Sequence, residues 1–161
     1  MDQKLYQKLN EQVTHEFFAG YLYLSMAAKF EEKSLTGFAH WMREQFKEEQ
    51  EHAMKIFDFI NSRGEKVELM PIPKPEAEWE EPIEAFKLAY EHEKKVTGLI
   101  TEIMDTAIEV KDYPTVALMN WFVQEQVEEE ENVIKIIEQL NYAQDNKSVI
   151  LMLDRQLADR A

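Results

Sequence analysis

The sequence predicts an all-α fold: a four-helix bundle with one long crossover between helices two and three, plus a short fifth helix at the C-terminus. Apolar residues recur at three- and four-residue steps through four long stretches, which is the spacing of an amphipathic helix. Only four glycines and five prolines interrupt the 161 residues, and three of those prolines fall between positions 71 and 75. A hydrophobic content of 45% beside 31% charged residues is typical of a globular chain. We therefore expect a single domain over residues 1–161.

The first pair of predicted helices occupies the first 64 residues. The first helix is predicted from about residue 3 to residue 32, and its apolar stripe includes Leu5, Leu9 and Val13. The segment "KSLTGF" breaks this pattern, and it offers Ser34 or Thr36 as the N-cap of the second helix. That helix should end near residue 63, with Gly64 at the C′ position.

A proline-rich segment, residues 65–81, separates the two predicted pairs. Its 17 residues can span about 55 Å when extended, whereas a helix of roughly 28 residues is about 42 Å long. The chain can therefore return along the whole bundle, so that the second and third helices run parallel. Pro82 fits the first turn of the third helix. "KDYP" separates this helix from the fourth. The four long helices together form a bundle over about residues 3–142. The short fifth helix covers about residues 146–159.

Charge and composition exclude several classes of protein. A net charge of −14 argues against nucleic acid as a partner, because phosphates attract basic surfaces. The absence of cysteine excludes disulfides, thiolate zinc sites and iron–sulfur clusters. No segment resembles a signal peptide, and no apolar run is long enough to span a membrane. We expect a cytoplasmic protein that binds neither nucleic acid nor a membrane.

Polar residues interrupt each apolar stripe near the middle of its helix. We call this set the polar belt: Glu16, Glu49, His52, Glu93, Gln126 and Glu129. Glu16 and Glu49 are 33 residues apart, and so are Glu93 and Gln126; each second member is followed three residues later by another metal-ligating type. Because residues three apart share one face of a helix, two helical hairpins should present matching polar groups at matching heights.

Convergence of these side chains in an apolar bundle would need a counter-charge. Buried, unpaired carboxylates cost several kcal/mol each, and their mutual repulsion favours protonation of some of them. A pair of metal cations removes that cost, and Glu49 is central enough to bridge two ions. Oxygen-rich ligands with one imidazole favour iron or manganese over structural zinc. The alternative is that these residues face water or form ordinary buried ion pairs.

These residues, on four long helices with a short fifth, resemble those of ferritin, most closely the bacterial non-haem type. The similarity covers nearly the whole chain and includes "LNEQ", "YEHEK" and "DYPT…WFVQEQVEEE". The resemblance implies a ferroxidase centre in which Glu16, Glu49 and His52 hold a first iron. Glu49 would bridge to a second iron held with Glu93 and Glu129, and Gln126 would lie close by and support the second iron or an oxygen ligand.

The resemblance has further implications for this chain. Tyr23 matches the family's tyrosine beside the centre, a source of an electron or a hydrogen bond. A third iron site of the bacterial type maps onto Glu48, Glu125, Glu128 and Glu129. By the same resemblance, dioxygen or peroxide oxidises Fe(II), and Fe(III) is stored as mineral inside a hollow 24-subunit shell of identical chains.

Departures from related families narrow the prediction. Bacterioferritins carry a haem-ligating methionine directly after the bridging glutamate, where this chain has Gln50, so no haem is expected. They also carry E-x-x-H on the fourth helix, where this chain has Gln126-x-x-Glu129. Two other functions stay open: a di-iron oxygenase or oxidase acting on another substrate, and a non-catalytic helical assembly that only binds cations.

Overall fold

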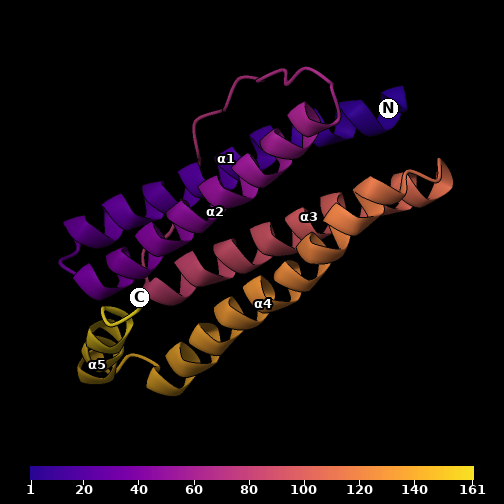
Figure 1. The fold of residues 1–161 in the computed structure, drawn as a ribbon. Coiled ribbons are helices and arrows are strands. Elements are labelled where there is room, and N and C mark those ends of the chain that lie inside the picture. The colour runs from indigo at the N-terminus through magenta and orange to yellow at the C-terminus, as the bar shows by residue number, and fades with distance from the viewer.

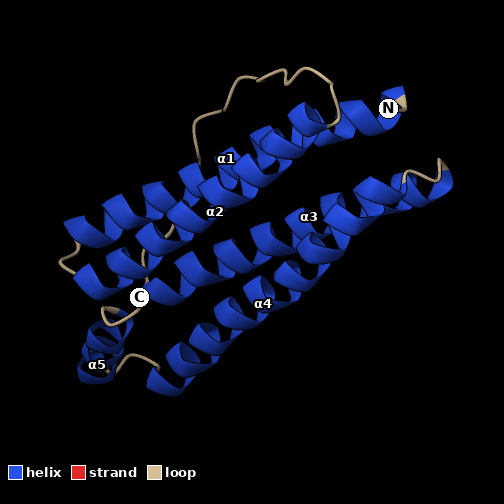
Figure 2. Ribbon diagram, in the orientation of Figure 1, coloured by secondary structure: helices blue, strands red, loops and turns tan.

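The computed structural model describes residues 1–161 as five helices and no strands (Figures 1 and 2). The long helices are α1 (Gln3–Glu32), α2 (Thr36–Ser62), α3 (Pro82–Glu109) and α4 (Tyr113–Ala143), and the short one is α5 (Lys147–Leu157). Helices α1 and α2 form one antiparallel hairpin, and α3 and α4 form a second (Figure 1). The crossover returns the chain along the first hairpin, so α2 and α3 run parallel. The predicted four-helix bundle with one crossover and a short fifth helix is confirmed.

The turn between α1 and α2 differs from the prediction. Ser34 has a φ of 60°, and its N–H donates to the Glu31 carbonyl while the Leu35 N–H donates to the Phe30 carbonyl. This pair of hydrogen bonds is the Schellman motif, so the Ser34 backbone ends α1. Thr36 is already the first residue of α2. The N-cap of α2 is Leu35, whose side chain makes no capping hydrogen bond. The prediction of Ser34 or Thr36 as the N-cap is therefore wrong.

A side chain from α5 caps the start of α2 instead. The buried carboxylate of Asp154 accepts a hydrogen bond from the Phe38 N–H at 2.9 Å. Gly37 permits this approach, because a Cβ at that position would lie 1.6 Å from the Asp154 carbonyl oxygen. A carboxylate at a helix N-terminus satisfies a free N–H group and interacts favourably with the helix dipole. Asp154 thus holds α5 against the end of the bundle.

The structure confirms the predicted end of α2 and start of α3. Gly64 adopts a φ of 73° and closes α2 with the same Schellman pair of hydrogen bonds. Pro82 is the first residue of α3, where its missing N–H has no intrahelical partner to lose. The Glu84 carboxylate accepts hydrogen bonds from the two N–H groups that precede this proline, each at 2.8 Å.

The polar belt divides the apolar core into two clusters. The cluster nearer α5 contains 18 buried residues, among them Phe30 and Phe86. The cluster at the opposite end contains 11, among them Leu9 and Ile100. Polar side chains buried between two apolar clusters have no access to bulk water, so their partners must come from the protein or from a bound ion. None of the five helices has the length and apolar character needed to cross a membrane.

Candidate metal centre

The structure brings the six residues of the polar belt together from all four long helices. None of them is more than 4% exposed. Glu16, Glu49 and His52 each offer a ligand atom within 4.8 Å of the others. Glu49, Glu93 and Glu129 form a second group by the same measure. Glu49 therefore belongs to both groups, at the position where a carboxylate can bridge two ions.

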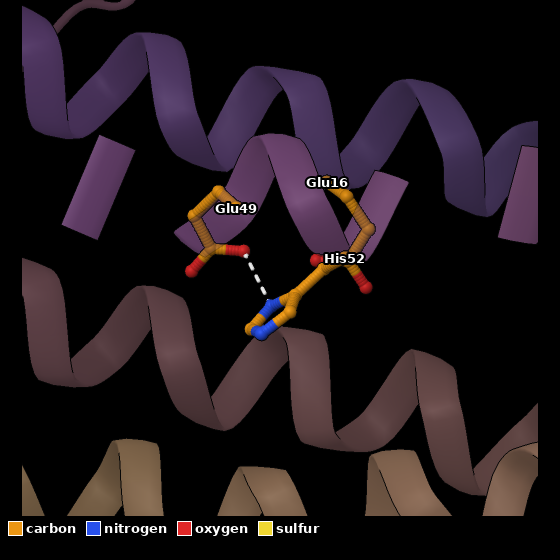
Figure 3. A group of neighbouring side chains, drawn as sticks. All are labelled: Glu16, Glu49 and His52. Carbon is orange, nitrogen blue, oxygen red and sulfur yellow. Dashed lines mark hydrogen bonds and ion pairs between the residues drawn. The ribbon is translucent and has the colours of Figure 1, made fainter. Parts of the chain in front are cut away.

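The first group combines residues of α1 and α2 (Figure 3). His52 Nδ1 lies 3.2 Å from Glu49 Oε2, one helical turn away. Gln12 donates its amide N–H to Glu16 Oε1 at 2.9 Å, whereas Glu16 Oε2 is buried and has no hydrogen-bond partner. A buried carboxylate oxygen without a donor is costly, and a cation would satisfy it. This orphaned oxygen fits a metal ligand.

Neutral hydrogen-bond donors hold the second group in place. The Tyr23 hydroxyl donates to Glu93 Oε1 at 2.5 Å, and the Gln126 amide donates to Glu93 Oε2 at 3.2 Å. The Gln45 amide donates to Glu129 Oε2 at 2.8 Å. Amides and hydroxyls orient these carboxylates without cancelling their negative charge, so the charge stays available to a cation.

Burial and repulsion between neighbouring carboxylates raise the pKa values of three carboxyls of the belt, those of Glu49, Glu93 and Glu129. Burial raises the pKa of Glu49 well above its usual range, and repulsion from neighbouring carboxylates adds to this. Burial also raises the pKa of Glu93 to about 7, against the opposing effect of the Tyr23 hydrogen bond. It raises the pKa of Glu129 to about 8. His52 lies 3.2 Å from Glu49, and no lysine or arginine pairs with any of the four belt carboxylates. The metal-free protein therefore holds protons where cations can bind.

The residues predicted for a third iron site are only partly brought together. They are Glu48, Glu125, Glu128 and Glu129. Glu125 and Glu129 form a group with His52, whose Nε2 lies 3.7 Å from Glu125 Oε1. Glu48 lines the same hollow as His52 and Glu125, but its carboxylate pairs with Arg160 at 2.8 Å. Glu128 is exposed and joins none of these groups.

Three neighbours of the belt were not predicted from the sequence. Gln12 lies four residues before Glu16, so both side chains share one face of α1. This spacing could have predicted their contact. Gln45 interrupts the apolar stripe of α2 as the belt residues do, but its partner Glu129 is 84 residues away. The ring of Trp121 stands edge-on to His52 with 5.5 Å between ring centroids, and no spacing in the sequence indicates that contact.

Known proteins similar to this chain share its full length. The family model described as a ferritin-like domain matches residues 6–143. The chain is 38% identical over 161 residues to a bacterial non-heme ferritin of Staphylococcus haemolyticus, covering 100% of this chain and 97% of the relative. It is 34% identical over 160 residues to a bacterial non-heme ferritin of Staphylococcus aureus, covering 99% and 96%. A solved open-pore ferritin from the hyperthermophilic archaeon Archaeoglobus fulgidus matches with a TM-score of 0.98 and 42% identity, covering 100% of this chain and 99% of that one.

Proposed function

Because the chain belongs to the ferritin family, whose members store iron and carry ferroxidase activity, we propose that its ferroxidase centre is the polar belt. Glu16, Glu49 and His52 bind the first Fe(II). Glu49 also contributes to the second position, together with Glu93 and Glu129. The observation that carries this proposal is the membership of Glu49 in both ligand groups, within a belt of buried carboxylates that no lysine or arginine neutralises.

Tyr23 and Gln126 position the second half of this centre. Both donate hydrogen bonds to Glu93, so its two oxygens have fixed directions before iron arrives. Fixing ligands in advance reduces the reorganisation needed when a metal binds. Two Fe(II) ions held side by side can each give one electron to dioxygen or peroxide.

A third iron near Glu125 and Glu129 stays a prediction. Glu125 and Glu129 offer ligand atoms within 4.8 Å of each other, beside His52, which already binds the first iron; this supports a cation position on the side of the belt that faces the hollow. Glu48 also lines this hollow and is the further carboxylate that we propose such an ion could use.

We propose further that the cage implied by the family is a shell of 24 identical subunits. Two surfaces of this chain support assembly: α5 exposes Leu151 and Met152, and the crossover exposes Leu69 and Ile72. Exposed apolar residues gathered on one element are typical of subunit interfaces. Light scattering after size-exclusion chromatography measures the particle mass, and a species close to the 19.1 kDa of one chain would contradict a shell.

Aerobic addition of Fe(II) tests the function as a whole. A storage ferritin accelerates the oxidation of iron and retains hundreds of iron atoms in each particle. Catalysed oxidation without retention would instead support an oxidase or oxygenase acting on another substrate. If Fe(II) were oxidised no faster with the protein than in buffer without it, the proposal would be overturned. The non-catalytic, cation-binding assembly would then be the remaining hypothesis.

A further inference from the structure

The residues that follow α5 return to α2 beside the polar belt. The Arg160 guanidinium donates to Gln45 Oε1 at 2.6 Å, to Glu48 Oε2 at 2.8 Å and to the Trp41 carbonyl at 3.2 Å. It also lies 4.7 Å from the centre of the Trp41 ring. His40 Nε2 lies 2.6 Å from the Arg160 carbonyl oxygen. The last residues of a chain are ordered only when specific contacts hold them, and here the contacts converge on a single arginine.

Through Gln45, Arg160 acts on a carboxylate that it does not touch. A guanidinium has donors and no acceptor, so the side chain of Gln45 must turn its oxygen toward Arg160. Its amide nitrogen is then directed to Glu129 Oε2, at 2.8 Å. The tail therefore sets the orientation of the hydrogen bond that Glu129 receives.

Through Glu48, Arg160 places a positive charge beside the predicted third iron position. Glu48 lines a hollow of about 590 Å³ together with His52 and Glu125. One oxygen of the Glu48 carboxylate is already bound to the guanidinium. A metal ion could use only the other oxygen of Glu48 while this contact stays in place, and the fixed charge of the guanidinium would repel it. The arginine therefore weakens the binding of a third ion.

We propose that Arg160 is a tethered cation that competes with a third metal ion for Glu48. The inference rests on the proposed function, because it takes the belt to be an iron centre. The contacts of Arg160 with Gln45 and Trp41 hold the tail in the competing position, so the affinity of the third position depends on how firmly the tail is docked. Arg160 is a positioning residue, since it touches none of the ligands of the first two irons.

Anaerobic titration of the protein with Co(II) tests the competition. Calorimetry and the visible absorption of bound Co(II) count the ions without any redox step. We expect two tightly bound ions per subunit in the parent protein. In Arg160→Gln a third ion should bind about 10- to 100-fold more tightly than in the parent, the range set by loss of one charged hydrogen bond.

Three further variants show which contact is responsible. Arg155→Gln removes the same charge from an exposed position of α5 and should bind Co(II) as the parent does. Arg160→Lys keeps a positive charge near Glu48, so its affinity for the third ion should lie between those of the parent and Arg160→Gln. This variant also tests the competition if Arg160→Gln does not fold. Glu48→Gln in the Arg160→Gln background should abolish the gain, because the freed ligand is removed.

The possible outcomes separate this inference from the function on which it rests. A third-ion affinity equal in the parent and in both Arg160 variants would overturn the competition, even with the first two ions bound normally. An equal gain in Arg155→Gln would do the same, since it would indicate net charge alone. A parent protein that binds no Co(II) tightly would instead overturn the assignment of the belt as the iron centre.

Discussion

The two helical hairpins carry the same spacing of polar residues but hold them differently. In the first hairpin, Glu16 keeps one buried oxygen without any partner. In the second, both oxygens of its counterpart Glu93 receive hydrogen bonds, from Tyr23 and Gln126. The first half of the belt is therefore free to accept a cation, whereas neutral donors restrain the second half.

The counterparts at the centre of the belt also differ in charge. Glu49 of the first hairpin corresponds by spacing to Gln126 of the second. An amide at this position limits the belt to four carboxylates, which reduces the repulsion that the metal-free protein must tolerate. It also leaves Glu49 as the one central carboxylate that both ligand groups share. The near-repeat thus yields one bridge and not two.

Removing ligands from the first hairpin should have the largest effect. We expect Glu49→Ala to slow the initial oxidation of Fe(II) by more than about 100-fold, since loss of mere outer partners of a metal site costs about 10- to 100-fold. His52→Ala should have a smaller effect, because His52 is not shared by the two iron positions. Stopped-flow absorbance of Fe(III) measures both rates. Glu32→Ala, an exposed change on α1, is the control, and parent rates in both ligand variants would refute the site.

Making the second hairpin like the first should destabilise the metal-free protein. Gln126→Glu adds a fifth buried carboxylate, and we expect the thermal midpoint at pH 8 in the presence of a chelator to fall by about 10 °C. Added Zn(II) should restore most of the loss, because a cation neutralises the new charge. Gln124→Glu makes the same change at an exposed position of α4 and should leave the midpoint within about 2 °C of the parent value. Equal midpoints in the two variants would argue against burial as the cause.

The metal-free protein should lose stability as the pH rises. The pKa of Glu93 is raised to about 7 and that of Glu129 to about 8, from 4.5 in the unfolded chain. Between pH 4.5 and these folded-state pKa values, the folded protein binds more protons than the unfolded chain. The two protonated carboxyls therefore stabilise the folded state fully below pH 4.5, and this stabilisation is lost as the pH rises through 7 and 8. Between pH 5 and pH 9 we expect the thermal midpoint to fall by roughly 5 °C or more. The double variant Glu93→Gln, Glu129→Gln should flatten this profile, and a midpoint that rises over the same range would contradict it.

The smallest effects should come from the donors that orient the two halves. Tyr23→Phe removes the 2.5 Å hydrogen bond to Glu93, and we expect about a 10-fold slower oxidation of Fe(II). Gln12→Leu removes the donor to Glu16 and should cost less, since the other oxygen of that carboxylate is already unrestrained. Single-turnover oxidation kinetics compare the two variants. If Tyr23→Phe and Gln12→Leu oxidised Fe(II) at equal rates, the two halves of the belt would not differ in how strongly hydrogen bonds restrain them.

Local signals were sufficient for most of the helix ends but not for the start of α2. Gly64 and Pro82 act through their own backbone geometry, so their neighbours in sequence decide their role. Ser34 also looked like a local signal, yet its positive φ ends α1. The cap of α2 comes from Asp154, which is 116 residues away from Phe38. No short window of sequence contains both residues.

The amino-acid sequence was enough to predict the helices and the membership of the polar belt, and its proline-rich segment is long enough for the crossover. Periodicity and proline placement are properties of consecutive residues, and the repeated spacing of 33 residues places the belt at one height in both hairpins. The folded structure was needed to show which belt oxygens have hydrogen-bond partners and that Arg160 contacts Glu48, 112 positions away in the chain. Such contacts depend on how whole helices dock against one another, and packing of that kind leaves no periodic trace in the sequence.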